Sequence, residues 1–287
     1  MRLVLLTVLT MTAFAANSVL NRAAVGHGHI GAVDFAVVRL LAGAVMLGLL
    51  VAGRRALTGQ AVWPGRRGRI AGPPSLLVYL FGFSLAYGAL DAGTGALILF
   101  GTVQITMFAG ALAAREPLPA RRWLGAGVAF LGLVYLLAPG SAAAGSLRHA
   151  ALMAAAGIGW GFYSLSARGT RDPLGATAWN FILAVPVAGL VVAFLPAPSP
   201  DAPAAPAGLL LAVVSGAVTS GLGYALWYAI LPGLGAARGG VAQLSVPVLA
   251  LAGGMAFLGE PLTLRFALAS VLVIGGVAAA VRPPRQP

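Results

Sequence analysis

Apolar runs long enough to cross a membrane recur along almost the whole chain, and no other feature restricts its fold so strongly. A helix that crosses the hydrocarbon layer needs about 20 apolar residues. The segments that we predict to span the membrane are Leu3–Leu20, Val33–Ala52, Ser75–Leu90, Thr94–Ala114, Trp123–Ala138, Ala150–Ser166, Ala176–Leu195, Leu209–Leu231, Ala237–Leu258 and Phe266–Val281. The connections are short and rich in glycine, proline and arginine, so we expect no soluble domain.

The amino-acid composition leads to the same class of protein. Hydrophobic residues make up 60% of the 287 positions and charged residues only 8%, whereas soluble domains carry about 25% charged residues. The net charge of +12 would suit nucleic-acid binding only if the arginines shared one hydrated face. Instead they stand at the ends of apolar runs, which predicts an integral membrane protein whose partner is the lipid bilayer, with no nucleic acid.

The positions of the arginines predict the orientation, because cytoplasmic loops carry the excess of positive charge. With the N-terminus inside, fourteen of the eighteen arginines fall on the cytoplasmic side, three on the other side and Arg39 within a span. We therefore expect a multi-pass protein of the bacterial inner (plasma) membrane with both termini in the cytoplasm.

Residues that carry chemistry are scarce. The sequence has no cysteine and three histidines, which excludes thiolate metal sites and cysteine catalysis. His27 and His29 share a short loop and His149 is distant, whereas metal sites need three or four converging ligands. We expect no metal site, no cofactor and no enzymatic activity.

An internal repeat relates the two halves of the chain. At a shift of 144 residues, the segment 116–118 (Glu-Pro-Leu) meets the identical segment 260–262, and Arg121 meets Arg265. Chance rarely aligns two such units in a chain with only two glutamates. We predict two repeats, residues 1–141 and 146–287, with five spans each. An odd number of spans forces tandem copies to insert with opposite orientation, an architecture of many secondary transporters.

The first span also has the outline of a signal peptide, because Arg2 precedes it and residues 13–15 (Ala-Phe-Ala) imitate a cleavage site. A second repeat match argues for a retained helix. An aromatic residue, a serine and an arginine recur at the same spacing in both halves, as Phe14, Ser18, Arg22 and as Trp160, Ser164, Arg168.

With ten spans, two five-span halves and paired Glu-Pro-Leu turns, the chain resembles the drug/metabolite transporter superfamily and, within it, the EamA family, which includes the YddG-type amino-acid exporters. The resemblance covers essentially the whole chain. It implies export of amino acids, drugs or other metabolites, no bound cofactor, and a central cavity surrounded by helices of both repeats.

Polar and aromatic residues inside the spans are the candidates for substrate contact, because lipid-facing positions reject polar groups. Aromatic stripes recur in the third and eighth spans, and packing between helices explains such stripes nearly as well as a binding site does. The candidate substrate-binding residues are Asn17, Tyr79, Phe83, Tyr87, Gln104, Trp160, Tyr163, Ser164, Tyr224, Trp227, Tyr228, Gln243 and Ser245.

Three further residues are candidates for gating or structure. Arg39 is the only charge well inside a span, and a buried arginine needs a carboxylate or several carbonyls. Glu260 is its predicted partner, in a pair that either latches the outer gate or holds two helices together; Asp34 is the weaker alternative. Pro247 is expected to break a backbone hydrogen bond in the ninth span.

Together these features predict an all-α integral membrane protein of ten transmembrane helices in two inverted five-helix repeats around a central cavity. Its expected function is export of small organic solutes, above all aromatic or neutral amino acids, by alternating access. The alternatives are an exporter of drugs or cationic amphiphiles and a lipid flippase. Without a carboxylate at midspan, transport down the substrate gradient is favoured over proton coupling. A monomer is expected, and a homodimer stays open.

Overall fold

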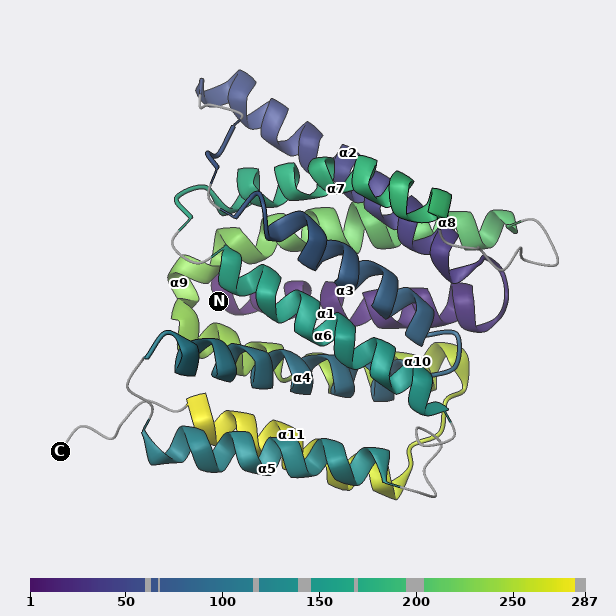
Figure 1. Cartoon of the computed structure of the whole chain (residues 1–287), viewed down its shortest axis with the longest axis vertical. Coiled ribbons are helices and arrows are strands. Elements are labelled where there is room, and N and C mark those ends of the chain that lie inside the picture. The colour runs from purple at the N-terminus through teal and green to yellow at the C-terminus, as the bar shows by residue number, and fades with distance from the viewer. Residues whose placement is uncertain are drawn as a thin grey trace.

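The computed structural model describes residues 1–59, 63–66, 68–115, 119–138, 146–167, 170–194 and 204–281, without the side chains of 235–238, 240, 241 and 281. Regular structure in these residues is helical throughout (Figure 1). The helices are α1 (Arg2–Asn21), η1 (Arg22–Gly26), α2 (Ala32–Thr58), α3 (Gly72–Ala86), α4 (Ala92–Ala113), α5 (Ala120–Leu137), α6 (Leu147–Ser166), α7 (Pro173–Phe194), α8 (Pro206–Val214), η3 (Ser215–Leu222), α9 (Gly223–Gln243), α10 (Val246–Leu258) and α11 (Leu264–Val281), of which η1 and η3 are π-helices.

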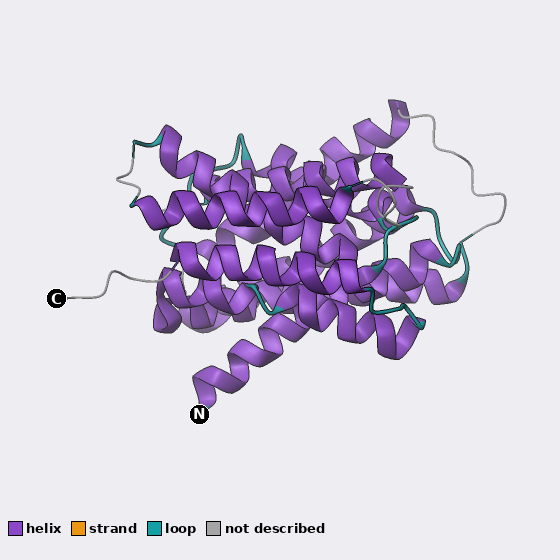
Figure 2. Cartoon of the chain, turned by 90° about the horizontal axis from the view of Figure 1, so that it is seen from below, coloured by secondary structure: helices purple, strands orange, loops and turns teal. Residues whose placement is uncertain are grey.

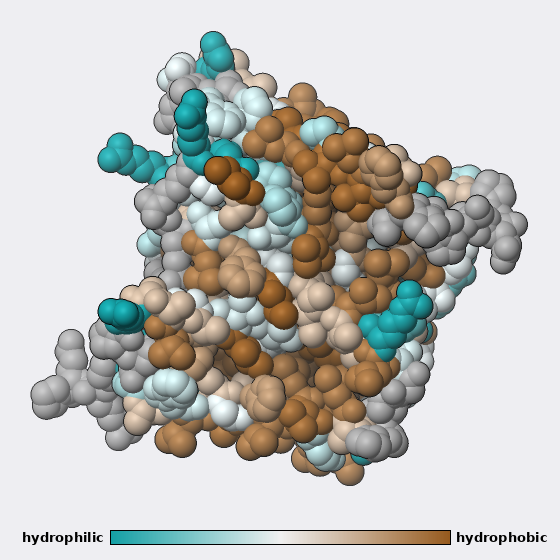
Figure 3. All heavy atoms as spheres, viewed as in Figure 1, coloured by the Kyte–Doolittle hydropathy of each residue, from teal (hydrophilic) through white to brown (hydrophobic). Residues whose placement is uncertain are grey.

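The chain is an all-α integral membrane protein. Six helical segments of the described residues are long and apolar enough to cross a membrane: Arg2–Gly26, Ala32–Thr58, Ala92–Ala113, Ala120–Leu137, Pro173–Phe194 and Pro206–Leu234. Shorter apolar helices are Gly72–Ala86, Val246–Leu258 and Leu264–Ala280. Hydrophobic residues cover the middle of the face in Figure 3, and hydrophilic residues gather toward its left and right edges, where helices end.

The helices run side by side along a common direction (Figures 1 and 2), and α1 begins at the end of the bundle where α11 ends. The pair α5 and α11 forms one border of the bundle. Gly125 and Gly276 let these two helices approach closely, because a Cβ at either position would meet the backbone of the other helix.

Contacts between helices follow a reciprocal pattern. Helix α3 packs on α6, while the η3 and α9 segment packs on α1; α4 packs on α6, while α10 packs on α1. The predicted repeat relates the members of each pairing. The division into repeats 1–141 and 146–287 stays a prediction, and one copy of its Glu-Pro-Leu turn, 116–118, lies outside the described residues.

The ninth span departs from the prediction. Helix α9 continues through Pro232 to Gln243, and the chain then turns at Leu244 and Ser245. Pro247 lies in the first turn of α10, where a missing N–H costs nothing because that position has no partner within the helix. The expectation that Pro247 breaks the middle of a helix is therefore wrong, since this residue helps to begin one.

Candidate functional site

A cavity lies between helices from both halves of the chain. Its walls come from α1, α3, α4, α6 and α9, and it encloses about 380 Å³ of atom-free space, including its open side. The lining residues are Phe14, Asn17, Ser18, Tyr79, Phe83, Leu99, Phe100, Trp160, Tyr224 and Gln243. Aromatic rings and neutral polar groups therefore face the same space.

The aromatic side of the cavity is built around Trp160 of α6. Its indole ring stacks on Tyr224 at 5.2 Å between ring centroids and on Tyr163 at the same distance, and it lies 4.9 Å from the Tyr79 ring. Phe14 of α1 adds a tilted contact with Tyr224 at 5.7 Å. Rings from four helices thus form one continuous apolar wall, which we call the aromatic cluster: Phe14, Tyr79, Phe83, Trp160 and Tyr224.

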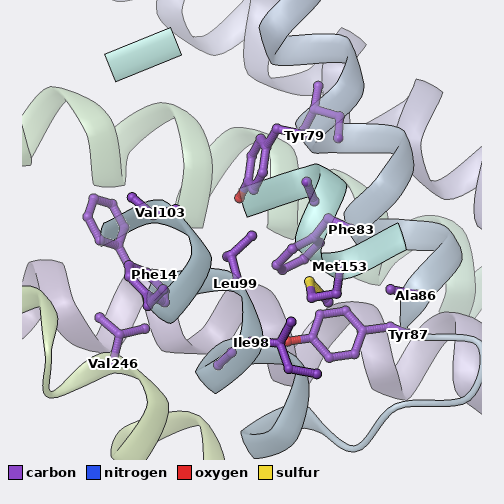
Figure 4. Packing of buried hydrophobic residues seen from close by; sticks show 14 of the residues in the cluster. Phe14, Tyr79, Phe83, Ala86, Tyr87, Ile98, Leu99, Val103, Met153 and Val246 are labelled. Atoms are coloured by element: carbon purple, nitrogen blue, oxygen red, sulfur yellow. The ribbon is translucent and has the colours of Figure 1, made fainter. Parts of the chain in front are cut away.

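The aromatic residues predicted to form a stripe on the third span lie partly in the cavity wall and partly in the core. Tyr79, Phe83 and Tyr87 project from α3 toward the same side, near Leu99 of α4 (Figure 4). Tyr79 and Phe83 line the cavity. Tyr87 packs against Gly95, and its hydroxyl donates to the Ala92 carbonyl oxygen at 3.2 Å. Tyr87 therefore joins α3 to the start of α4.

The lining residue Asn17 is held from behind by hydroxyl groups of the π-helix η3, whose residues do not themselves line the cavity. The i→i+5 bonding of a π-helix widens its turn, and residues four and five apart here face α1 together. Asn17 Oδ1 accepts hydrogen bonds from Ser215 Oγ at 2.8 Å and Thr219 Oγ1 at 2.6 Å, and Ser220 Oγ lies 3.5 Å away. We call Asn17, Ser215, Thr219 and Ser220 the polar cluster.

Arg39 lies behind the junction of these two clusters and is fully buried, with 0% of its surface exposed. Its Nε donates to Ser220 Oγ at 3.1 Å and its Nη2 to the Tyr79 hydroxyl at 2.9 Å. The guanidinium carbon also lies 4.9 Å from the Phe83 ring centroid and 5.3 Å from that of Tyr79. Hydroxyl groups and ring faces, rather than a carboxylate, surround this charge.

The predicted pair of Arg39 and Glu260 is consequently wrong. Glu260 follows α10 and caps α4, because both of its carboxylate oxygens accept from the Ala92 N–H, at 3.0 and 2.9 Å. Its charged neighbour is Arg22, with Nε 3.5 Å from Oε1. Gly254 makes room for this arrangement, since a Cβ there would overlap the Glu260 carboxylate. Burial raises the pKa of the Glu260 carboxyl group above its ordinary value.

Of the thirteen predicted contact residues, six line the cavity: Asn17, Tyr79, Phe83, Trp160, Tyr224 and Gln243. The others, besides Tyr87, lie elsewhere. Tyr163 donates to Thr177 Oγ1, which donates to the Tyr228 hydroxyl, each at 3.0 Å, so both tyrosines are directed toward α7. Trp227 packs against Phe14 at 5.9 Å.

The hydroxyls of the two predicted serines that do not line the cavity donate to nearby backbone carbonyl oxygens. Ser164 Oγ donates to the Trp160 carbonyl oxygen at 2.8 Å, and Ser245 Oγ donates to that of Ala242 at 2.7 Å. Gln104 is half-buried on α4 and outside the lining set.

Sequence reasoning missed four lining residues, Phe14, Ser18, Leu99 and Phe100. Leucine and phenylalanine in an apolar helix give no local sign of a cavity. The repeat match did carry a signal for the first two, because Phe14 and Ser18 align with Trp160 and Ser164.

At the end of the bundle where α1 begins, a second arginine of α2 has a different environment. Arg54 forms a two-point ion pair with Asp172, with Nη1–Oδ1 2.7 Å and Nη2–Oδ2 2.6 Å. Asp172 also accepts from the Gly175 N–H in the first turn of α7. The hydrogen bonds from Arg54 hold the pKa of the Asp172 carboxyl group below its ordinary value. This pair joins α2 to α7.

Comparisons with known proteins agree with this architecture. The EamA-like transporter family matches residues 147–282. An uncharacterized protein of Pseudomonas aeruginosa is 47% identical over 283 residues, which cover 98% of this chain and 95% of that protein. A solved crystal structure of a protein matches with a TM-score of 0.62 at 20% identity, over 94% of this chain and 95% of its own. That last likeness concerns the fold alone.

Proposed function

The chain belongs to the EamA-like transporter family, and on this premise we propose that it exports small organic solutes, above all aromatic or neutral amino acids, through the cavity between α1, α3, α4, α6 and α9. The observation that supports this proposal most directly is the composition of the cavity. Aromatic rings and uncharged hydrogen-bonding groups line one space, which suits a solute with an apolar body and a small polar head.

The proposed mechanism is alternating access. The cavity residues come from both halves of the chain: α1, α3 and α4 before residue 141, α6 and α9 after residue 146. In inverted-repeat transporters, one half rocks against the other around a site at their interface. A cavity shared in this way would open to one side of the membrane at a time. We place the protein in the bacterial inner membrane with both termini in the cytoplasm.

A second candidate function is export of cationic amphiphiles, and the aromatic cluster favours it. Ring faces attract ammonium groups by cation–π interaction. The Trp160 ring centroid lies 4.9 Å from that of Tyr79 and 5.2 Å from that of Tyr224.

The test is uptake by proteoliposomes that contain the purified protein. Vesicles loaded with unlabelled phenylalanine are diluted into buffer with labelled phenylalanine, and counterflow is compared with that of protein-free vesicles. A cationic dye and a fluorescent phospholipid are assayed in parallel. Saturable counterflow of phenylalanine is the expected result. Movement of the dye or of the lipid, with no phenylalanine counterflow, would overturn the proposal in favour of the corresponding alternative.

A further inference from the structure

The buried guanidinium of Arg39 has one donor group left over. Its Nε and Nη2 are hydrogen-bonded to Ser220 and Tyr79, whereas Nη1 is buried with no hydrogen-bond partner in the part of the chain that the structure describes. An unpaired donor on a buried charge is costly, because the group loses its water without replacement. A ligand that accepts a hydrogen bond from Nη1 would explain why this donor has no partner within the protein.

A second free donor lies close to the first. Asn17 Oδ1 is occupied by the hydroxyls of Ser215 and Thr219. Its amide NH₂ has no hydrogen bond among the described residues, although Asn17 lines the cavity. Ser220 connects the two sites, because its Oγ accepts from Arg39 Nε at 3.1 Å and lies 3.5 Å from Asn17 Oδ1. Two donors, one of them charged, therefore point to a ligand that is purely an acceptor.

The surrounding charges favour the same ligand. Four acids lie in the described residues, Asp34, Asp91, Asp172 and Glu260, and none of them lines the cavity. Among the described residues, the charge in contact with the lining rings is the positive charge of Arg39. A solute with an ammonium group alone would meet this charge without a carboxylate to offset it. A carboxylate would bind Arg39 with charge-assisted hydrogen bonds.

We infer that the transported solutes must carry a carboxylate, which binds Arg39 and Asn17, while the aromatic cluster holds the apolar body and the amino group is dispensable. Aromatic monocarboxylates would therefore be substrates alongside aromatic amino acids, and organic cations would be rejected. This inference rests on the proposed function. Because the Tyr79 and Phe83 rings cover Arg39, binding requires one of these rings to rotate away from the guanidinium.

Binding of three probes with the same phenyl group tests the inference: 3-phenylpropionate, phenylalanine and phenethylamine. The affinity of the purified protein in detergent is measured by calorimetry. The wild type should bind 3-phenylpropionate at least as tightly as phenylalanine. It should bind either of them at least about 10-fold more tightly than phenethylamine, as expected for hydrogen bonds to a charged group.

Variants assign this preference to Arg39. In Arg39→Gln the ratio of affinities for 3-phenylpropionate and phenethylamine should fall at least about 10-fold. In Arg39→Lys part of the ratio should remain, because the charge stays and the planar fork is lost. The control is Arg148→Gln, since Arg148 is exposed at the start of α6; it should keep the wild-type ratio. Thermal unfolding shows whether each variant is folded.

Two outcomes would overturn the inference: equal affinities of the wild type for all three probes, or a wild-type ratio in folded Arg39→Gln. Equal affinities of the wild type would overturn the inference without any variant, so the test stands even if Arg39→Gln does not fold. Phenylalanine counterflow by proteoliposomes made from the same purified protein tests the proposed function separately. If counterflow is intact but the three probes bind with equal affinity, only the inference about the carboxylate is overturned. Charge-selective binding without counterflow overturns the proposed function.

Discussion

Two arginines of one helix, Arg39 in the first half of α2 and Arg54 near its end, occupy opposite environments. Arg54 is partly exposed, at 24% of its side chain, and makes a two-point ion pair with Asp172. Arg39 is fully buried and contacts hydroxyls and rings instead of a carboxylate. Each of the two arginines has one buried donor without a partner among the described residues, Nη1 in Arg39 and Nε in Arg54, so the contrast lies in their partners and their exposure. An arginine whose role is to hold helices together is most stable where water still solvates it and a carboxylate neutralises its charge. Arg54 fits that role, and Arg39 fits a role in binding.

The largest expected effect is the loss of phenylalanine counterflow when a residue of the aromatic cluster beside Arg39 is replaced. Trp160→Ala should reduce phenylalanine counterflow at least about 10-fold, because it removes the central ring of the aromatic cluster that lines the cavity. An aromatic pair between that ring and the phenyl group of the solute would contribute about 0.5–1.5 kcal/mol beyond its buried area. The matched control is Trp123→Ala. Trp123 is on α5 and contacts Phe108 edge to face at 5.0 Å, and 51% of its surface is exposed; the control should keep most of its counterflow. Equal losses in both variants would contradict the division between cavity and periphery.

A smaller effect tests whether Arg39 really lacks a carboxylate partner. Double-mutant cycles compare Arg22→Gln with Glu260→Gln and Arg39→Gln with Glu260→Gln, by the free energy of unfolding in detergent. Residues in contact couple by about 0.5–3 kcal/mol, whereas separate sites add within about 0.5 kcal/mol. The first pair should couple, because Arg22 Nε lies 3.5 Å from Glu260, and the second should be additive. Coupling of Arg39 with Glu260 would restore the pair that the structure replaces.

The smallest effect concerns the ion pair at the end of α2. Asp172→Asn should lower the free energy of unfolding near neutral pH by about 1 kcal/mol, because water screens this partly exposed pair and reduces its contribution. The hydrogen bonds from Arg54 lower the pKa of Asp172. Its contribution is therefore present above the unfolded value of 3.8 and is lost as the pH falls through the folded value.

Unfolding of the wild type and of Asp172→Asn should consequently converge in acid. Asp34→Asn serves as the control, since Asp34 is exposed in the first turn of α2. Phenylalanine counterflow should be the same in all three proteins at neutral pH. A loss of counterflow in Asp172→Asn as large as that in Trp160→Ala would erase the contrast between the two regions.

Much of this fold could be predicted from the sequence, because the bilayer imposes a length and a composition on each span. The predicted segment Thr94–Ala114 corresponds to α4, Ala92–Ala113, within two residues at each end. The break between the eighth and ninth spans could not be predicted in this way. Gly and Pro suggested a connection after Leu231, but α9 continues to Gln243, because neighbouring helices can accommodate a proline within an apolar helix.

Residue types that are improbable in lipid predicted part of the cavity lining, although Gln104 is also of this kind and lies outside the lining. Asn17, Trp160 and Gln243 are of this kind, and all three line the cavity. Leu99 is of the opposite kind, since its residue type is ordinary in any span. Partners across the chain, such as Glu260 and the Ala92 N–H 168 positions away, depend on tertiary packing that the local pattern does not contain.

One measurement tests most directly whether the cavity is the path of the solute. Because the sequence has no cysteine, single-cysteine variants can be labelled without background. Gln243→Cys places a thiol at the cavity, and Ser245→Cys places one two residues away at an exposed position. Both are treated in proteoliposomes with a small thiol reagent, with and without phenylalanine.

We expect labelling of Gln243→Cys to stop counterflow and phenylalanine to slow that labelling, while labelled Ser245→Cys continues to transport. Labelled Gln243→Cys that still transports phenylalanine at its unlabelled rate would contradict the account, because the solute would then have to pass by another route.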